Sequence, residues 1–316
     1  MSAVSPADFG GLTHIEESGF SPQEEKLPVM ITSAPSGLEG EGFPVKRAFA
    51  GVGSRYLDPF VHMDQMGSVR YEPGQAKGTP WHPHRGFETV TYMIDGVFEH
   101  HDSTGKGGLI AGGDTQWMTA GSGILHIETP PLSEVLSGGL FHGIQLWVNL
   151  PAKDKFIEPK YQDIKAEHVK MLSSKEEGAL VRVIAGDMAG EKGPGVTKTP
   201  IVFLHASIHV GERLILPWGG GLNCLVYVLS GKGLISSRQT PINEGQLAVM
   251  SDGGYVELRA IRTDSVAEKT MEVILLGGEP IGEKVVKYGP FVMNTMDEIK
   301  DAFDDYAAGK FGKPIT

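Results

Sequence analysis

Cysteine is almost absent from this 316-residue chain, and its scarcity limits the kinds of protein that the chain can be. The single cysteine, Cys224, excludes an intramolecular disulfide framework and favours a reducing compartment. Cys224 lies in the apolar run 222–229, where a buried structural thiol is expected rather than a nucleophile. We therefore expect a cytoplasmic protein without disulfide bonds.

Long hydrophobic runs and an excess of basic residues are also missing. No apolar stretch approaches the roughly 20 residues of a membrane helix, and residues 1–20 lack the basic start and apolar core of a signal peptide. The formal net charge is −11, which repels the phosphates of nucleic acids and of anionic membranes. We expect no direct nucleic-acid partner and no membrane partner.

Glycine and proline, by contrast, are plentiful, with 43 and 20 residues. That composition suits short strands joined by tight turns, and the length favours two domains. We predict an all-β fold of two antiparallel β-barrel (jelly-roll) domains. Residues 1–40 would form an N-terminal extension with one strand at Val29–Thr32, residues 41–152 the first domain, and residues 153–316 the second. The strands predicted for the first domain are Phe87–Ile94, Val97–His101, Gly107–Ala111, Thr115–Thr119, Ile124–Glu128 and Gly143–Leu150.

A weak internal repeat supports two copies of one domain. The segment 87–96 matches 222–231 in its apolar positions, in a tyrosine (Tyr92 and Tyr227) and in its final glycine. Downstream, 113–118 matches 245–250.

A helix is predicted near the end of the chain. Thr295 and Glu298 have the spacing of a capping box, and Gly309 is a plausible stop. The helix is expected to pack across the outside of a barrel, because its apolar residues share one face: Met296, Ile299, Ala302, Phe303 and Tyr306.

Two short pairs of residues, here called dyads, are the candidate metal ligands. His82 and His84 are two residues apart, as are His126 and Glu128, and residues at this spacing in an extended segment point to the same face. Both dyads border glycine-rich turns, so both can project into one barrel interior. Three imidazoles and one carboxylate make a site for a first-row divalent metal with open positions. In the second copy the corresponding positions are Pro217, Gly219 and Leu258, so we predict that the second domain holds no metal.

Other polar residues near the dyads are expected to have supporting roles. Arg85 and Glu88 would form a structural ion pair at the rim. Of the adjacent His100 and His101, at most one can face the site, and we expect both to be at the surface or in the second shell. Gln116 and Trp117 would pack behind the ligands.

The dyads lie in segments that resemble the pirin family of bicupins. The matching stretches are Trp81–Tyr92, Gly113–Glu128, Asp58–Phe60, Gln145–Leu150 and Gly289–Thr295, and the resemblance extends over nearly the whole chain after residue 45. It implies one mononuclear metal, Fe(II) above all, bound by His82, His84, His126 and Glu128. By the same analogy Glu88 is not a ligand, and Phe60, His62 and Met63 line the cavity mouth.

The resemblance implies two functions of different classes. Some pirin-like proteins are similar to quercetin 2,3-dioxygenases, which implies ring cleavage of a flavonol or similar enolic aromatic by O2. The metal would lower the pKa of the substrate hydroxyl, and Glu128 would take its proton as the catalytic residue. The alternative is a non-enzymatic, iron-binding and redox-responsive protein that regulates a transcription factor or another protein partner. A cupin isomerase or hydrolase with Mn, Co, Ni or Cu remains a third possibility, since such sites accept these ions.

Overall fold

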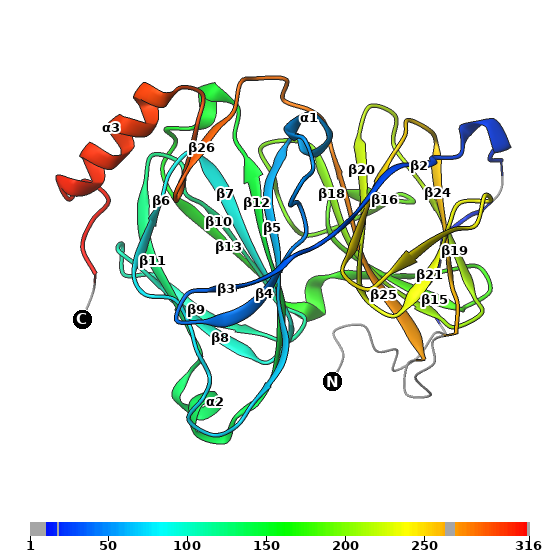
Figure 1. Ribbon diagram of the computed structural model, residues 1–316, viewed down its shortest axis with the longest axis horizontal. Helices are drawn as coiled ribbons and strands as arrows, with labels where there is room; N and C mark the ends of the chain where they lie inside the picture. Colours follow the sequence, from blue (N-terminus) through cyan, green and yellow to red (C-terminus); the bar gives the residue numbers. More distant parts are fainter. Residues whose placement is uncertain (1–10, 18, 263–268, 315–316) are drawn as a thin grey trace.

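Two β-sandwiches lie side by side in the computed structural model, which describes residues 11–17, 19–262 and 269–314 (Figure 1). Each sandwich consists of a large sheet facing a four-stranded sheet, and the strands are antiparallel except for the short β1, which pairs in parallel with β14. This arrangement is a bicupin, so the predicted all-β fold class is confirmed. Glycines with positive φ, among them Gly96 and Gly231, lie in its tight turns.

The first sandwich contains the residues of both dyads. Its large sheet has the strand order β13-β10-β7-β12-β5-β4-β3 and its small sheet the order β6-β11-β8-β9. The strands are β3 (Ser36–Glu39), β4 (Phe43–Arg47), β5 (Phe60–Tyr71), β6 (His82–His84), β7 (Phe87–Asp95), β8 (Val97–Asp102), β9 (Gly107–Ala111), β10 (Thr115–Thr119), β11 (Ile124–Thr129), β12 (Gly139–Asn149) and β13 (Lys160–Ile164).

The second sandwich has the same design. Its large sheet has the order β1-β14-β15-β18-β25-β20-β23-β2, and its small sheet the order β19-β24-β21-β22. The strands are β1 (Thr13–His14), β2 (Pro28–Ser33), β14 (Lys170–Ser173), β15 (Ala179–Ala185), β18 (Ile201–His209), β19 (Arg213–Pro217), β20 (Asn223–Ser230), β21 (Lys232–Ile235), β22 (Thr240–Asn243), β23 (Gln246–Met250), β24 (Tyr255–Ala260) and β25 (Thr270–Gly278); the short pair β16 (Asp187–Met188) and β17 (Glu191–Lys192) lies beside it.

The register of the strands confirms the internal repeat. Thr115 on β10 pairs with Tyr92 on β7, and the corresponding Leu247 on β23 pairs with Tyr227 on β20. The repeat therefore reflects one strand arrangement used twice.

The two large sheets pack face to face, and both repeat tyrosines cross the interface. A buried apolar cluster joins residues of the two sheets, including Val90 and Trp117 from the first and Phe203 from the second. The Tyr92 hydroxyl lies 2.8 Å from Nδ1 of His205, and the Tyr227 hydroxyl donates to Gln65 Oε1 at 2.8 Å. The two tyrosines thus join the two sandwiches. Their presence in both copies of the repeat reflects this packing role.

Segments from outside each predicted domain complete its sheets. The strand expected at Val29–Thr32 is confirmed as β2, but it pairs with β23 of the second sandwich, whereas β3 continues into the first. Conversely β13, which lies beyond the boundary predicted at residue 152, pairs with β10 in the first sandwich. The boundaries 1–40, 41–152 and 153–316 remain a prediction about folding units, since the sheets themselves share chain across them.

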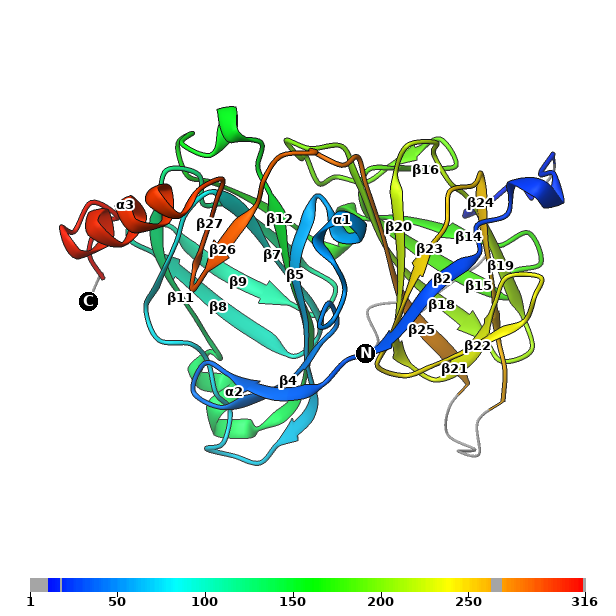
Figure 2. The same cartoon turned by 45° about the horizontal axis from the view of Figure 1, so that its top comes forward.

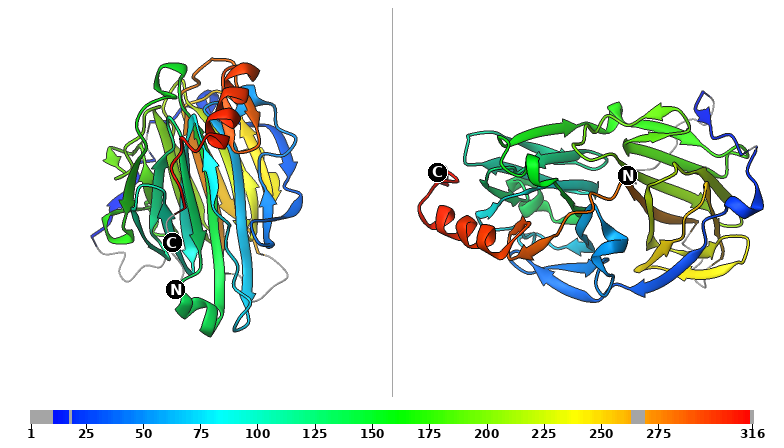
Figure 3. Two further views of the ribbon diagram at one scale, coloured as in Figure 1. Left: turned by 90° about the vertical axis from the view of Figure 1, so that its left-hand side faces the viewer. Right: turned by 90° about the horizontal axis from the view of Figure 1, so that it is seen from above.

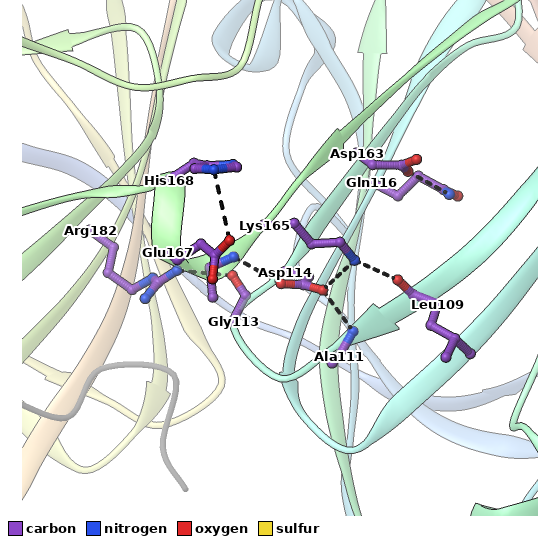
Figure 4. A network of polar contacts seen from close by, with 11 residues as sticks. Leu109, Ala111, Gly113, Asp114, Gln116, Asp163, Lys165, Glu167, His168 and Arg182 are labelled. Carbon is purple, nitrogen blue, oxygen red and sulfur yellow. Dashed lines mark hydrogen bonds and ion pairs between the residues drawn. The ribbon is translucent and has the colours of Figure 1, made fainter.

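The connection after β13 is anchored to the first sandwich by a polar network (Figure 4). Asp114 accepts hydrogen bonds from Lys165 Nζ and from the Ala166 backbone, each at 2.8 Å. Arg182, on β15, donates to the Gly113 carbonyl at 2.9 Å. One turn of the first sandwich therefore holds both the connection and the second sandwich.

The end of the chain returns to the first sandwich. After β25 the chain forms β26 (Val286–Tyr288), β27 (Phe291–Met293) and α3 (Met296–Ala307), and α3 covers the side of the first sandwich farthest from the second (Figures 1 and 2). The predicted capping box is present, with Thr295 Oγ1 accepting from the Glu298 backbone. Ile299 and Ala302 are buried in a cluster with Leu125.

The other helical segments are short: α1 (Ser54–Leu57), α2 (Leu132–Ser137) and the 3-10 turns Pro22–Glu24, Ala152–Asp154 and Ala166–His168. The views along two further axes show the strands running through both halves and α3 at one end (Figure 3). Within the described ranges, every helix is too short or too polar to cross a bilayer.

Candidate metal centre

The first dyad forms the edge strand β6, which pairs with β11 so that His82 lies opposite His126. The imidazole centroids of these two residues are 4.2 Å apart, and the His84 centroid is 4.8 Å from that of His82 and 4.9 Å from that of His126. The prediction that the two dyads share one face is thus confirmed, because alternation on both strands turns the three imidazoles inward.

Backbone carbonyls determine the tautomers of the first dyad. His82 Nδ1 donates to the Pro80 carbonyl at 2.8 Å, and His84 Nδ1 donates to the Pro290 carbonyl at 3.3 Å. In a neutral imidazole the other nitrogen, Nε2, then carries a lone pair. The Nε2 atoms of His84 and His126 are buried without a hydrogen-bond partner from the protein. Buried unpaired acceptors are costly, so these atoms suit a metal ion.

The electrostatics of the site also favour metal binding. Burial lowers the pKa of His82, and burial together with the neighbouring histidines lowers the pKa values of His84 and His126 well below 6.5. The three side chains are therefore neutral at neutral pH, which is the form that binds metals.

Glu128 lies slightly apart from this group. Potential ligand atoms of His82, His84 and His126 all lie within 4.8 Å of one another, whereas Glu128 forms a second such group with His126 and His100. Thr91 donates a hydrogen bond to Glu128 Oε1 at 2.6 Å, and burial raises the pKa of the carboxyl group. A donor set of three imidazoles and a nearby carboxylate fits a divalent metal. The assignment of the four residues as ligands stays a prediction.

His100 is closer to the centre than the sequence indicated. It lies on β8 opposite Glu128, is 1% exposed, and its Nδ1 is 3.4 Å from Nδ1 of His126. Of the two expected places for His100, the surface or beside the ligands, the structure shows the second, because its ring contacts that of His126. His101 points the other way and contacts Glu99 at the surface, as alternation requires. The position of His100 opposite Glu128 could have revealed its place near the imidazoles. That pairing depends on the strand register, which the sequence alone does not give.

The predicted ion pair between Arg85 and Glu88 was wrong. Arg85 pairs with Asp305 of α3 at 2.9 Å, whereas Glu88 accepts a hydrogen bond from Thr119 at 2.7 Å. The two side chains leave the chain on different sides of the sharp turn at Gly86, which has φ +89°. Of the two residues expected to pack behind the ligands, Trp117 lies in the interface between the sandwiches and Gln116 contacts Asp163.

A cavity of about 470 Å³ opens onto His82, His84 and Glu128, a volume within the range of small-molecule sites. His62 lines it as expected, but Phe60 and Met63 line a neighbouring cavity of about 430 Å³. Apolar side chains form much of the wall, while charged groups and the last strands supply the rim. The lining residues are Glu39, Gly40, Phe43, Val45, Arg47, His62, Asp64, Met66, Thr79, Pro80, His82, His84, Phe98, Glu128, Gln145, Trp147, Lys287, Gly289 and Pro290.

Several known proteins are similar to this chain in sequence and in fold. The family model described as Pirin matches residues 42–148, and that described as Pirin C-terminal cupin domain matches residues 203–312. A pirin-like protein from Solanum lycopersicum is 38% identical over 91% of this chain and 93% of its own length. The chain belongs to the pirin family.

Solved structures share the fold of this chain. A quercetin 2,3-dioxygenase from Acinetobacter baumannii superimposes with a TM-score of 0.85 at 36% identity, covering 92% of this chain and 100% of the other. The bacterial pirin YhhW from Escherichia coli, in complex with nickel(II), shares the fold with a TM-score of 0.58 at 19% identity, covering 79% and 100%.

In this pirin-family chain the second sandwich has an apolar interior where the first has its dyads. Leu214 and Leu216 on β19 and Val256 and Leu258 on β24 are fully buried in its core. Within the described ranges, both groups of potential metal ligands lie in the first sandwich. Leu214 lies opposite Leu258 as His82 lies opposite His126, so the predicted counterparts Pro217 and Gly219 were wrong and Leu214 and Leu216 take their place. The absence of a metal from the second sandwich stays a prediction.

Proposed function

We propose that this protein is a metal-dependent dioxygenase that opens the ring of a flavonol or similar enolic aromatic at one mononuclear Fe(II). The observation that carries the proposal is the cluster of three imidazoles, in which Nε2 of His84 and of His126 is buried without a protein partner, beside a cavity lined by His82, His84 and Glu128 that is large enough for a small aromatic molecule. The similarity to a quercetin 2,3-dioxygenase along 92% of the chain supports the reaction class.

His82, His84, His126 and Glu128 would hold the metal. The bound ion would supply Lewis acidity toward the substrate hydroxyl and open positions for substrate and O2. Mn, Co, Ni or Cu are the competing ions for such donors, and nickel(II) occupies the complex of the Escherichia coli pirin.

Glu128 would accept the hydroxyl proton of the substrate. Its carboxyl group is buried at the cavity wall, which raises its pKa and makes it a stronger base than an exposed glutamate. Thr91 holds Oε1 in place. The apolar wall, with Phe43, Phe98 and Trp147, would exclude water and contact the aromatic rings of the substrate.

The deciding experiment is anaerobic loading with Fe(II) followed by oxygen uptake with quercetin, beside a His126→Ala variant. We expect rapid metal-dependent uptake that the variant lacks. Stoichiometric iron without uptake would overturn the enzymatic proposal and favour the regulatory protein with a protein partner.

The ligand set is tested by His84→Ala, which we expect to weaken metal binding at least about 100-fold with little loss of fold. The matched control is His101→Ala, because His101 is exposed and lies outside the cavity. Metal content by elemental analysis and circular dichroism check both points. Stoichiometric metal in His84→Ala would refute the assignment.

We also propose a reducing compartment such as the cytoplasm, which the buried free thiol of Cys224 supports. The partners would be a small aromatic substrate and O2, and the net charge of −11 disfavours direct contact with nucleic acid.

A further inference from the structure

Four polar side chains form a row along the rim of the metal-site cavity. Arg47 Nη1 lies 3.5 Å from Asp64 Oδ2, and His62 Nε2 lies 3.3 Å from the same oxygen. Lys287 Nζ continues the row, 3.3 Å from His62 Nδ1. Because Nε2 of His62 faces a carboxylate and carries the hydrogen, Nδ1 can accept a hydrogen bond from the Lys287 ammonium.

The one carboxylate of this row, that of Asp64, already has two partners. Arg47 pairs with both Asp64 and Glu39, and His62 also contacts Asp64. Lys287 contacts only neutral acceptors, His62 Nδ1 and, at 3.5 Å, the Val61 carbonyl; none of the ion pairs of the described residues includes it. Two of its three ammonium hydrogens are used in these contacts, so one is left for an anion at the cavity mouth.

Lys287 and the metal site face one aromatic wall. Lys287 Nζ lies 5.2 Å from the centroid of the Trp147 ring, and the His84 ring lies 5.3 Å from the same centroid. An aromatic molecule lying along Trp147 can therefore present one end to the metal-binding nitrogens and the other end to the ammonium. The remaining wall is apolar, with Phe43, Met66 and Phe98.

We propose that Lys287 is a substrate-binding residue and that the substrate carries a carboxylate at the end remote from the oxygen that binds the metal. The inference rests on the proposed function for the orientation of the substrate. It narrows the substrate class from enolic aromatics in general to acidic ones.

The test measures dissociation constants in metal-loaded protein under anaerobic conditions for two matched pairs of probes. The first pair is 3-hydroxyflavone and its 4′-carboxylate, whose absorption reports chelation of the metal. The second pair is flavone and flavone-4′-carboxylate, which lack the chelating hydroxyl and are followed by calorimetry. We expect each carboxylate to bind about fivefold more tightly than its uncharged partner, which is the upper end of what a half-exposed ion pair contributes. Added salt should reduce this ratio of dissociation constants.

Lys287→Gln should bring the ratio to about one, and Lys287→Arg should retain it. Lys284→Gln is the matched control, because it removes the same charge from an exposed position on the same segment outside the cavity. A ratio of one in the unmodified protein, a ratio unaffected by Lys287→Gln, or no binding of either flavone would overturn the inference. A lysine-dependent ratio in the flavone pair without any absorption change in the hydroxyflavone pair would support Lys287 while refuting the proposed metal chemistry.

Discussion

At the scale of single residues, the tautomers and charges of the site depend on atoms that the dyads do not contain. Carbonyls of Pro80 and Pro290 hold the Nδ1 hydrogens of His82 and His84, and Thr91 holds Glu128. These contacts leave Nε2 atoms directed at one point and keep the carboxylate oriented. Small changes in them should therefore alter chemistry without altering the fold.

Metal uptake should release few protons. Because burial lowers the folded-state pKa of His82, and that of His84 and His126 well below 6.5, these imidazoles are neutral at pH 7.5. We expect less than one proton to be released per divalent ion at pH 7.5, measured with an indicator dye in weak buffer, and affinity to fall only below about pH 6.5. Any residual release should come from Glu128 and vanish in Glu128→Gln. Release of two or more protons would contradict the neutral-histidine assignment.

Thr91→Val should shift the pH dependence of oxygen uptake. The hydrogen bond from Thr91 lowers the pKa of Glu128 against the raising effect of burial, so its loss should raise that pKa further. Since the base must be deprotonated, the acidic limb of the rate profile should move to higher pH, by about one unit, with metal content unchanged.

The matched control for Thr91→Val is Thr119→Val, which removes a similar buried hydrogen bond to Glu88 outside the cavity. The pH dependence of oxygen uptake by Thr119→Val should match that of the unmodified protein. Equal shifts in both variants would argue against a role for Glu128 as the base.

At the scale of elements, the return of β26 and β27 to the first sandwich completes the wall of the candidate metal site. The Val292 amide donates to the Arg85 carbonyl at 3.1 Å, and Lys155 Nζ joins the carbonyls of Gly86 and Val292 at 2.8 and 3.0 Å. These contacts place the Pro290 carbonyl against His84. The turn after the first dyad and the C-terminal strands therefore act as one unit.

The substitution Gly86→Ala should separate the turn after the first dyad from the C-terminal strands β26 and β27. Gly86 has φ +89°, and a Cβ there would lie 2.1 Å from the Val292 carbonyl oxygen. We expect faster hydrogen exchange in residues 286–307 and about tenfold weaker metal binding, because His84 loses its carbonyl partner.

Gly74→Ala provides the control, since Gly74 has φ +83° but no atom within 4 Å of an added Cβ. It introduces the same backbone strain without the clash. Weakened metal binding in both variants, or in neither, would contradict the proposed link.

At the scale of the whole molecule, the interface between the two large sheets makes the halves interdependent. Tyr92 and Tyr227 each bond to the opposite sandwich, and their partners His205 and Gln65 occupy corresponding positions on β18 and β5. The contacts of Tyr92 and Tyr227 are thus related by the pseudo-symmetry of the two sandwiches. We expect a single cooperative unfolding transition.

Tyr92→Phe and Tyr227→Phe should each lower the free energy of unfolding by about 1 kcal/mol, because a buried polar partner loses its hydrogen bond. Urea unfolding followed by fluorescence and circular dichroism measures this. Tyr56→Phe, whose hydroxyl contacts only the exposed Arg55, should change stability by less than about 0.5 kcal/mol. Two separate transitions, or no loss in either interface variant, would contradict a coupled interface.

Features that depend on local periodicity and turn chemistry could be predicted from the sequence alone. Alternation in extended segments predicted the strands and the shared face of His82, His84 and His126, whereas counting along the repeat missed the counterparts Leu214 and Leu216 by three residues. The capping box likewise predicted α3. Each of these features depends on residues only a few positions apart, so a linear pattern is sufficient to predict it.

Only the tertiary structure decided the contacts between distant segments. The pairing of Arg85 with Asp305, the place of His100 beside His126, the Pro290 carbonyl on His84 and the approach of Lys287 to the cavity all join parts of the chain that local patterns cannot relate. Their positions depend on strand register, on the packing of the two sandwiches and on the return of the C-terminal strands. These are outcomes of burying apolar surface in three dimensions, and periodicity along the chain does not encode them.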